Sequence, residues 1–325
     1  MKPSRRTRPG RRSASEPVAA LDFGAHTLKL AEVEHGPLGP VVRTFGVMPY
    51  LHDRHGQADL VGTLSELLHR AGAVARHTLL VVPETDAFIV RAAHPHRRAN
   101  LAYHLTQACS TWPMTATTDA EGHEHHDTLA VPKLVVEFYR DVVDAAGRQL
   151  AGVAHTPTAL GRSFAKTPRT AVLEQGAESS GWYLYDRGHL VQRRTLPYGG
   201  QALTTALALA HGWDQDKAEQ HKRQLSGDPA GWPTETQHVV AQYLQRWWSD
   251  LQGVLAERPA FVDRVVLVGG GTRLAPLREF VFNQLGLVPE DWQLPPHAHV
   301  AEHVRPYLAP HLPVLADALA LLVTP

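Results

Sequence analysis

The sequence predicts an α/β protein in which two related halves face a common cleft. Three observations support this prediction. A segment near the N-terminus is repeated 152 residues further along the chain, strand-like runs alternate with helical runs, and a run of glycines follows a buried strand near the C-terminus. The chain has 325 residues, a length typical of about two domains, and 43% of them are hydrophobic, which is enough for a substantial core.

The repeat consists of Val18–Pro49 and Thr170–Pro197. In each copy an apolar run ends in a carboxylate, the turn x-Gly-Ala follows, and a second glycine opens a third run, so each copy predicts three antiparallel strands. Glycine permits close approach of the backbone, which lets the amides of the turn surround an anion while the carboxylate holds a metal ion. One such turn is a common hairpin, but two in register indicate a shared site. The matched residues are Asp22, Gly24, Ala25 and Gly36 in the first copy and Glu174, Gly176, Ala177 and Gly188 in the second.

Helical and strand-like patterns alternate between the two copies. Leucines recur at helical spacing before a short apolar run typical of a buried strand. The segment from about residue 86 to 152 predicts a small inserted α+β subdomain, in which Cys109 lies on a helix. The predicted helices are Ala58–Gly72, Arg97–Ser110, Tyr139–Gly147 and Thr158–Lys166, and the predicted strands are Thr78–Pro83 and Leu129–Phe138.

The second half continues the alternation. Gly212 ends one predicted helix and Asp214 caps the next, as their positions in the apolar pattern require. A long amphipathic helix then leads to a buried strand, a glycine run and a final pair of helices. The predicted helices are Gln201–His211, Asp214–Leu225, Gln237–Glu257, Pro276–Leu285 and Pro313–Val323, and the predicted strand is Arg264–Val268.

The glycine run is a third candidate ligand loop. Gly269, Gly270, Gly271 and Thr272 follow the buried strand and precede a helix, which places bare backbone where a flat or anionic ligand can approach. Neither G-x-G-x-x-G nor G-x-x-x-x-G-K-[ST] is completed, so the loop is not that of a Rossmann or P-loop protein. Together with the two repeated turns, it predicts the third wall of a nucleotide pocket.

Charge and composition exclude several classes of protein. Lys plus Arg and Asp plus Glu are both 32, but residues 1–17 carry a net charge of +5, which leaves −5 for the rest of the chain. The mildly acidic body argues against a nucleic-acid groove, and the basic arm is expected to be disordered or to contact anionic lipid. The single cysteine excludes a disulfide framework and fits a reducing cytosol, and no run of 18 apolar residues predicts a membrane span.

Three stretches carry a resemblance to a known family: Leu21–Leu30 (LDFGAHTLKL), Leu196–Leu225 and Val265–Leu277 (VVLVGGGTRLAPL). Their order and spacing resemble the actin-like ATPase superfamily of actin, hexokinase and FtsA. Within it, the chain is most similar to the PilM family of type IV pilus proteins. The resemblance implies an actin-like fold with two RNase H-like cores around a nucleotide cleft, and ATP and Mg²⁺ as ligands.

The resemblance also implies a role for each matching residue. Asp22 and Glu174 would hold Mg²⁺ through water, and two glycine turns would wrap the phosphates. The implied phosphate residues are Gly24, Ala25, His26, Thr27 and Lys29 in the first loop, and Glu174, Gly176 and Ala177 in the facing loop. The implied cleft and adenosine residues are Gly199, Gly200, Glu219, Lys222, Gly269, Gly270, Gly271 and Thr272. By pattern alone, Glu219 and Lys222 are also compatible with an ordinary solvated i,i+3 pair.

A domain organisation and a set of partners follow from the same resemblance. The implied units are a basic arm (1–17), a first domain (18–166) with the inserted subdomain (86–152), a second domain (167–309) and a C-terminal helix that returns to the first domain (310–325). The implied partner is the cytoplasmic N-terminal peptide of the membrane protein PilN, held near residues 86–155. Further contacts to pilus secretion ATPases, and a cytoplasmic location at the inner membrane, are implied as well.

Two departures from the family pattern predict slow turnover. Glu174 stands where the family has Asp, and His26 stands where it favours small hydroxyl residues. Phosphoryl transfer depends on accurate positioning of water and metal, so a displaced carboxylate reduces catalysis more than affinity. We find no assignable catalytic base. We therefore expect ATP to bind and to be hydrolysed slowly.

Two other functions remain open on sequence grounds. A small-molecule kinase of the same superfamily needs a general base, for which Asp53 and Asp59 are the nearby candidates. An FtsA-like filament former needs a C-terminal amphipathic membrane helix, whereas Pro313–Val323 has no basic face and predicts a core helix. The cluster His123–Asp127 contains metal-ligating residue types, but adjacent residues rarely converge on one ion, so we expect a solvated hairpin tip.

Overall fold

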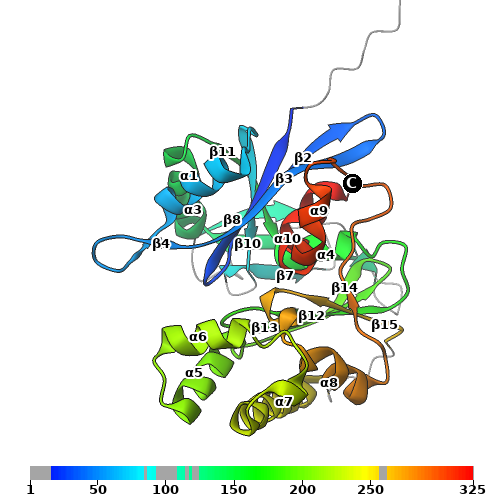
Figure 1. The fold of residues 1–325 in the computed structure, drawn as a ribbon. Coiled ribbons are helices and arrows are strands. Elements are labelled where there is room, and N and C mark those ends of the chain that lie inside the picture. The colour runs from blue at the N-terminus through cyan, green and yellow to red at the C-terminus, as the bar shows by residue number, and fades with distance from the viewer. Residues whose placement is uncertain are drawn as a thin grey trace, which may run out of the picture.

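Two β-sheets, with helices between them and on their outer faces, form the body of the protein in the computed structural model (Figure 1). The structure describes residues 16–83, 86–92, 108–113, 117–118, 124–255 and 262–324. The basic arm therefore lies almost entirely outside the described residues, as does most of the predicted helix Arg97–Ser110.

The first sheet has six strands in the order β11-β6-β1-β2-β3-β17. β1, β2 and β3 are antiparallel neighbours, and β6 and β11 extend the sheet in parallel from β1. The strands are β1 (Val18–Phe23), β2 (Thr27–Gly36), β3 (Gly39–Pro49), β6 (His77–Val82), β11 (Gln149–His155) and β17 (His299–Val300).

The second sheet repeats this construction with five strands in the order β14-β13-β12-β15-β16. Its first three strands are again antiparallel, and β15 pairs with β12 in parallel, as β6 does with β1. The predicted repeat of three antiparallel strands is thus confirmed in both halves. The strands are β12 (Thr170–Gln175), β13 (Ser180–Asp186), β14 (His189–Leu196), β15 (Arg264–Val268) and β16 (Glu290–Asp291).

Helices separate and cover the two sheets. The α-helices are α1 (Leu60–Ala71), α3 (Lys133–Ala145), α4 (Thr156–Arg162), α5 (Gly200–His211), α6 (Gln215–Arg223), α7 (Thr234–Leu255), α8 (Pro276–Leu285), α9 (Arg305–Leu308) and α10 (Leu312–Val323). The 3-10 turns are η2 (Pro229–Gly231), η3 (Gly270–Arg273) and η4 (Ala309–His311). Most predicted helices are confirmed within a few residues, and Asp214 caps α6 as predicted, its side chain accepting from the backbone N–H of Lys217.

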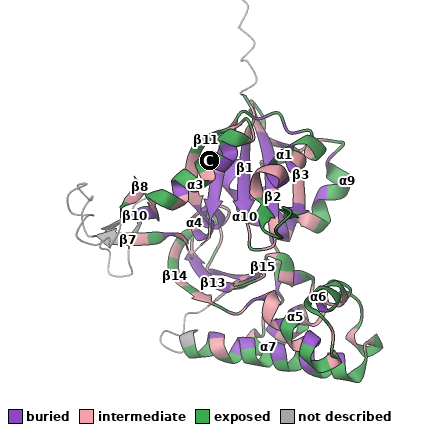
Figure 2. Ribbon diagram, turned by 90° about the vertical axis from the view of Figure 1, so that its left-hand side faces the viewer, coloured by how far each residue is buried: buried purple, intermediate pink, exposed green. Residues whose placement is uncertain are grey.

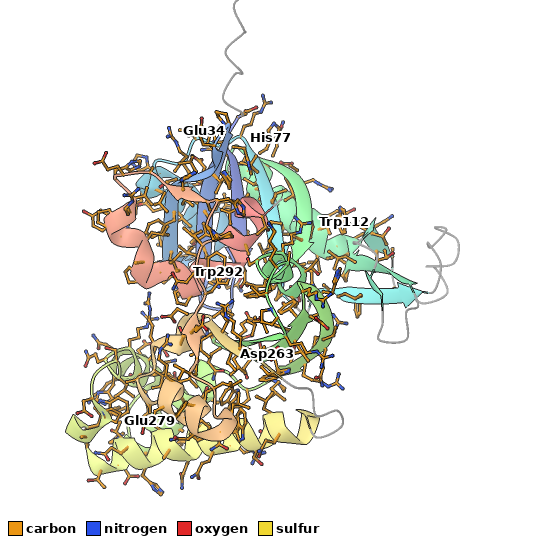
Figure 3. All side chains as sticks on the ribbon, turned by 90° about the vertical axis from the view of Figure 1, so that its right-hand side faces the viewer. Glu34, His77, Trp112, Asp263, Glu279 and Trp292 are labelled. Atoms are coloured by element: carbon orange, nitrogen blue, oxygen red, sulfur yellow. The ribbon has the colours of Figure 1, made fainter. Side chains whose placement is uncertain are left out.

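Strand alternation explains why the chain forms five layers. In β1, Ala20 faces the space between the sheets, whereas Leu21 faces α1 and α3 on the outer side. In β12, Val172 likewise faces inward and Leu173 faces α5, α7 and α8. The middle core, between the sheets, is filled by α4, α10 and the buried Trp292, which Figure 3 places between the two halves. Figure 2 shows the buried strands at the centre and the exposed face of α7 at the surface.

The inserted segment corrects two predictions. It forms a small sheet of β7 (Phe88–Ala92), β8 (Cys109–Pro113), β9 (Thr117–Thr118) and β10 (Glu124–Pro132), followed by α3; β4 (Leu51–His52) and β5 (Ala58–Asp59) form a separate hairpin before α1. Cys109 therefore opens a strand and not a helix, because its backbone pairs with Pro132 of β10. The predicted strand Leu129–Phe138 ends at Pro132, where α3 begins. α3 is helical because Val136, Val142 and Val143 form one apolar face against the first sheet.

One further correction concerns the turn glycines. Gly36 closes β2, and it is Gly39, at φ +122°, that opens β3, whereas the aligned Gly188 lies directly before β14 as predicted. Each hairpin has a loop of two residues, Pro37 and Leu38 in the first half and Arg187 and Gly188 in the second. Glycine is required at Gly39 and Gly188, because positive φ is accessible to it without strain.

The described residues include one helical run that is long and apolar enough to cross a membrane by length and composition, Arg305–Val323. Of its most apolar window, 67% is buried inside the protein. The run ends in α10, whose side chains are part of the middle core between the sheets. Its hydrophobicity is thus accounted for by core packing.

Candidate functional site

A cavity of about 1120 Å³ lies where the two repeated turns face each other. Of the residues that the resemblance implies for the nucleotide site, all but Gly199 and Thr272 line it. The lining candidates are Asp22, Gly24, Ala25, His26, Thr27, Lys29, Glu174, Gly176, Ala177, Gly200, Glu219, Lys222, Gly269, Gly270 and Gly271. Residues from β1, β12, α5, α6 and the loop after β15 thus meet in one place, although they are far apart in the sequence.

The first turn joins β1 to β2 and is closed by its own backbone. The N–H of Gly24 donates to the carbonyl of Thr27 at 3.1 Å, and the hydroxyl of Tyr50 donates to the carbonyl of Gly24 at 2.6 Å. Asp22 lies near the end of β1, just before the turn, and pairs with Lys29 of β2 in the strand register. Their side chains form an ion pair of 2.6 Å, with both largely buried.

The second turn has the same backbone geometry and a different anchor. The N–H of Gly176 donates to the carbonyl of Ser179 at 2.9 Å, matching the bond in the first turn. The turn then docks on the start of α5, because the N–H groups of Gly200 and Gln201 donate to the carbonyls of Gly176 and Ala177. Two of the free N-terminal N–H groups of α5 are satisfied in this way.

Gly199 stabilises this docking without lining the cavity. A Cβ atom at Gly199 would meet the backbone of Ala177 and Ser179 at 2.6 Å, so any side chain there would push the second turn away from α5. Glycine is therefore needed at this position for packing. The ligand role that the resemblance implies for Gly199 is reduced to a supporting one by this geometry.

The glycine run after β15 packs tightly against the end of β12. Gly269 has φ +89°, and a Cβ there would collide with the backbone of Gln175; a Cβ at Gly271 would collide with the Gln175 side chain. The buried hydroxyl of Thr272 donates to the carbonyl of Gly269 at 2.8 Å, which fixes the loop from behind. Gly270 faces open space, so bare backbone is presented to the cavity at this point.

Glu219 and Lys222 form a network that ties α6 to α5, and not merely a solvated pair. The carboxylate of Glu219 lies 2.6 Å from the Lys222 ammonium and accepts from the hydroxyl of Thr204 at 2.6 Å. Lys222 also donates to the carbonyl of Gly200 and to Thr204. Partial burial raises the pKa of Glu219, but the hydrogen bonds from Lys222 and Thr204 outweigh it, so the pKa is lowered overall.

The charges at the centre of the cavity are dominated by carboxylates around one lysine. Burial lowers the pKa of Lys29, but the charges of Asp22, Asp317 and Glu174 outweigh burial and raise it. Lys29 is therefore a permanent cation at neutral pH. Glu174 accepts a hydrogen bond of 2.7 Å from the buried hydroxyl of Tyr183, which holds its carboxylate toward β13.

Sequence reasoning missed several residues of the lining. Asp317 of α10 reaches the cavity, and its signal was present: it is the sole charged residue in an apolar helix. Arg273 directly follows the glycine run, and Gln175 directly follows Glu174; position beside a known loop could have identified both. Tyr50 and Tyr139 line the cavity from the first half without a sequence signal that distinguishes them from core aromatics.

Other candidates lie elsewhere. Asp59 caps α1, and Asp53 accepts backbone N–H bonds in the β4–β5 turn; neither lines the cavity, so the kinase base that the sequence left open is not in place. Side chains of the cluster His123–Asp127 lie outside the described residues. Among the residues that the structure does describe, no three His, Cys, Asp or Glu side chains lie close enough to hold one metal ion directly.

No family model matches the chain, and no curated protein matches it either. Solved structures do match. A PilM–PilN type IV pilus biogenesis complex has a TM-score of 0.74 at 19% identity, covering 94% of this chain and 96% of that one. The ethanolamine utilization protein EutJ from Carboxydothermus hydrogenoformans follows with a TM-score of 0.59 at 17% identity, covering 96% and 90%.

MreB5 of Spiroplasma citri bound to AMPPNP has a TM-score of 0.51 at 12% identity, covering 85% of this chain and 91% of that one. At these identities the likeness establishes the fold. The chain has the actin-like ATPase fold, which confirms the fold class predicted from the sequence.

Proposed function

From the actin-like ATPase fold as premise, we propose that the chain binds ATP with Mg²⁺ in the cavity between its two sheets and acts as a scaffold of the PilM type. The observation that carries the proposal is the meeting of both repeated turns and the glycine run on one cavity. A nucleotide as the ligand is supported by the fold, since an MreB5 with this fold was solved with AMPPNP.

The nucleotide would lie across the cavity with its phosphates between the two turns. The phosphates would be bound by backbone N–H groups and by one cation. The N–H groups are those of Gly24 to Thr27 and of Gly176 to Ser179, and the cation is Lys29. The base and ribose would lie between α6 and the glycine run, where Glu219, Lys222, Gly270 and Gly271 all line the cavity. Arg273 adds a guanidinium, whose flat face suits an aromatic base.

Mg²⁺ would be held through water by Asp22 and Glu174. The carboxylates present suit a hard cation that keeps most of its own waters, and the spacing of the described acidic side chains excludes direct binding by three of them. The ion would supply charge neutralisation for the phosphates. The protein's own contribution is to position the phosphates by backbone amides and to hold Lys29 charged.

Slow hydrolysis follows from how Glu174 is held. Its carboxylate accepts from Tyr183 and so has a fixed position on the β13 side of the cavity. Attack by water on a phosphate requires the water to be placed within a few tenths of an ångström, and neither Asp53 nor Asp59, the candidate bases from the sequence, lines the cavity. The proposed activity is nucleotide-dependent binding, with ATP turnover slow at best.

The proposed partner is the cytoplasmic N-terminal peptide of a PilN-like membrane protein. The inserted segment exposes three large apolar side chains, Phe88 on β7 and Leu134 and Phe138 on α3, the last two one helical turn apart. The next residue, Tyr139, lines the cavity and packs on Phe23 at 4.8 Å. The proposed partner surface and the proposed nucleotide site thus share the helix α3. In this proposal the protein is cytoplasmic and the peptide recruits it to the inner membrane. Pilus secretion ATPases are proposed as further partners.

The nucleotide proposal is tested by titrating fluorescent ATP with Mg²⁺ into the wild type, Asp22→Asn and the surface control Glu66→Gln, while recording phosphate release. We expect binding in the wild type and in the control, weakening of at least about tenfold in Asp22→Asn, and little phosphate release. Rapid release would support a kinase or motor instead. Absence of binding in the wild type would overturn the proposal.

The partner proposal is tested with a PilN-type N-terminal peptide and the variants Leu134→Asp and Leu209→Asp. Leu209 is an equally exposed leucine on α5, so it controls for the loss of a surface leucine. We expect Leu134→Asp alone to weaken peptide binding measured by calorimetry. Equal binding by both variants would remove α3 from the interface.

A further inference from the structure

Asp317 is a buried carboxylate in a place where the fold needs only apolar side chains. It lies in the middle of α10, every other residue of which is apolar, and all residues of the helix except Pro313 are buried. The side chain of Asp317 is 6% exposed and lines the cavity. A buried carboxyl group costs stability unless it is paired or hydrogen-bonded, so its presence calls for a physical reason.

The protein itself leaves this carboxyl incompletely satisfied. Its Oδ1 atom is buried and makes no hydrogen bond with any residue that the structure describes. The charged groups that face it are Lys29, Asp22 and Glu174, from β2, β1 and β12. Burial, and then the charges of Glu174 and Asp22, raise the pKa of Asp317, while Lys29 lowers it. Three acidic groups therefore converge on one lysine that is already paired with Asp22 at 2.6 Å.

A polyphosphate entering this region would add negative charge to an acidic cluster with one cation. Binding of the polyphosphate therefore requires additional positive charge near these carboxylates. The oxygen atoms of the described acidic side chains do not lie close enough together for three of them to bind one ion directly. A hydrated divalent cation meets both conditions, because Mg²⁺ keeps several waters and bridges carboxylates to phosphates through them.

We propose that Asp317 is a third carboxylate of the divalent-cation site, sharing with Asp22 and Glu174 the ion that accompanies the nucleotide, and that it makes nucleotide binding depend on that ion. The inference rests on the proposed nucleotide function and deepens it. Asp317 acts through the cation and not on the nucleotide itself, so it is a positioning residue. Without the ion, the three carboxylates oppose the phosphates; with it, they hold the ion against them.

The test is the dissociation constant of a fluorescent ATP analogue, measured with Mg²⁺ and with EDTA, for the full chain and two variants. Asp317→Asn removes the charge and keeps the shape. Asp86→Asn is the matched control, because Asp86 also lines the cavity but is not among the residues proposed to hold the ion or the phosphates. The quantity compared is the ratio of the dissociation constant without Mg²⁺ to that with Mg²⁺.

We expect this ratio to fall at least about tenfold in Asp317→Asn, the size of effect that outer carboxylates have on metal sites, and to stay near the wild-type value in Asp86→Asn. An unchanged ratio in Asp317→Asn, or an equal fall in both variants, overturns the inference while leaving nucleotide binding intact. Failure of the wild type to bind the analogue with Mg²⁺ overturns the proposed function instead. Thermal unfolding of each variant separates the two effects of Asp317, since a purely structural role would change the melting temperature and not the ratio.

Discussion

The two repeated turns have the same backbone hydrogen bond but differ in the residue that lies opposite the carboxylate. Both close with an N–H to carbonyl bond over three residues, and both follow a carboxylate at the end of a central strand. In the first half the residue across from the carboxylate is Lys29; in the second half the equivalent residue is Gly181. The space above Gly181 is filled by the ring of Tyr183, whose hydroxyl binds Glu174. The two halves thus share the backbone geometry of the turn, but only the first has a cation directly opposite its carboxylate.

The largest expected loss of stability comes from removing the Asp22–Lys29 ion pair of the first half. Lys29→Met leaves Asp22 buried without its partner and close to Asp317 and Glu174, so we expect the free energy of unfolding to fall by about 3 kcal/mol, measured in urea. The corresponding change in the second half, Tyr183→Phe, removes one hydrogen bond and is expected to cost about 1 kcal/mol. Recovery of stability in the double variant Asp22→Asn/Lys29→Met would tie the loss to the ion pair. Equal costs in the two halves would contradict the comparison.

Shortening the Glu174 side chain of the second half by one methylene should alter the rate of hydrolysis more than the affinity for nucleotide. In Glu174→Asp the carboxylate no longer reaches the Tyr183 hydroxyl and is free to orient water at the phosphates. We expect phosphate release to rise about tenfold with nucleotide affinity nearly unchanged, since a shift of about one bond length affects positioning more than binding. Steady-state phosphate release and the dissociation constant are measured together. A parallel loss of binding would show that Glu174 serves affinity in its present position.

The smallest expected change in stability concerns the carboxylate of Glu219, on α6 of the second half. Its pKa is lowered in the folded state, so its contribution to stability is present above its unfolded pKa, about 4.3, and is lost as the pH falls through the folded value. We expect Glu219→Gln to be less stable than the wild type by about 1 kcal/mol at pH 7. The difference should disappear at the lowest pH where both remain folded, as thermal unfolding would report. A difference independent of pH would exclude the charge of Glu219 as its cause.

Sequence patterns predicted most of the candidates that line the cavity, because their backbone requirements are local. Gly24 and Gly176 make close contacts within their own turns, and Gly269 adopts a positive φ, and such needs are visible in a single sequence. Asp317 and Tyr183 could not be placed in this way. Their roles depend on α10 passing between the sheets and on the missing side chain at Gly181, which are properties of the assembled fold.

The inserted segment shows why local patterns failed there. The run Leu134–Tyr139 combines β-branched and aromatic residues that favour strands, yet it is helical, because packing of Val136 and Val143 on the first sheet decides the period. Cys109 is in a strand because β10 pairs with it, although the residues before it carry a helical pattern. Tertiary contacts override weak propensities in both cases.

The chain passes from one sheet to the other twice, once through α4 after β11 and once between β16 and β17, after which α10 returns between the sheets (Figure 1). α4 and α10 pack against each other there, and their buried residues include Ala159, Leu160, Ala316 and Ala320. α10 belongs to a core that contains residues from both sheets. The helix that carries Asp317 therefore connects the two walls of the cavity as well as contributing to its lining.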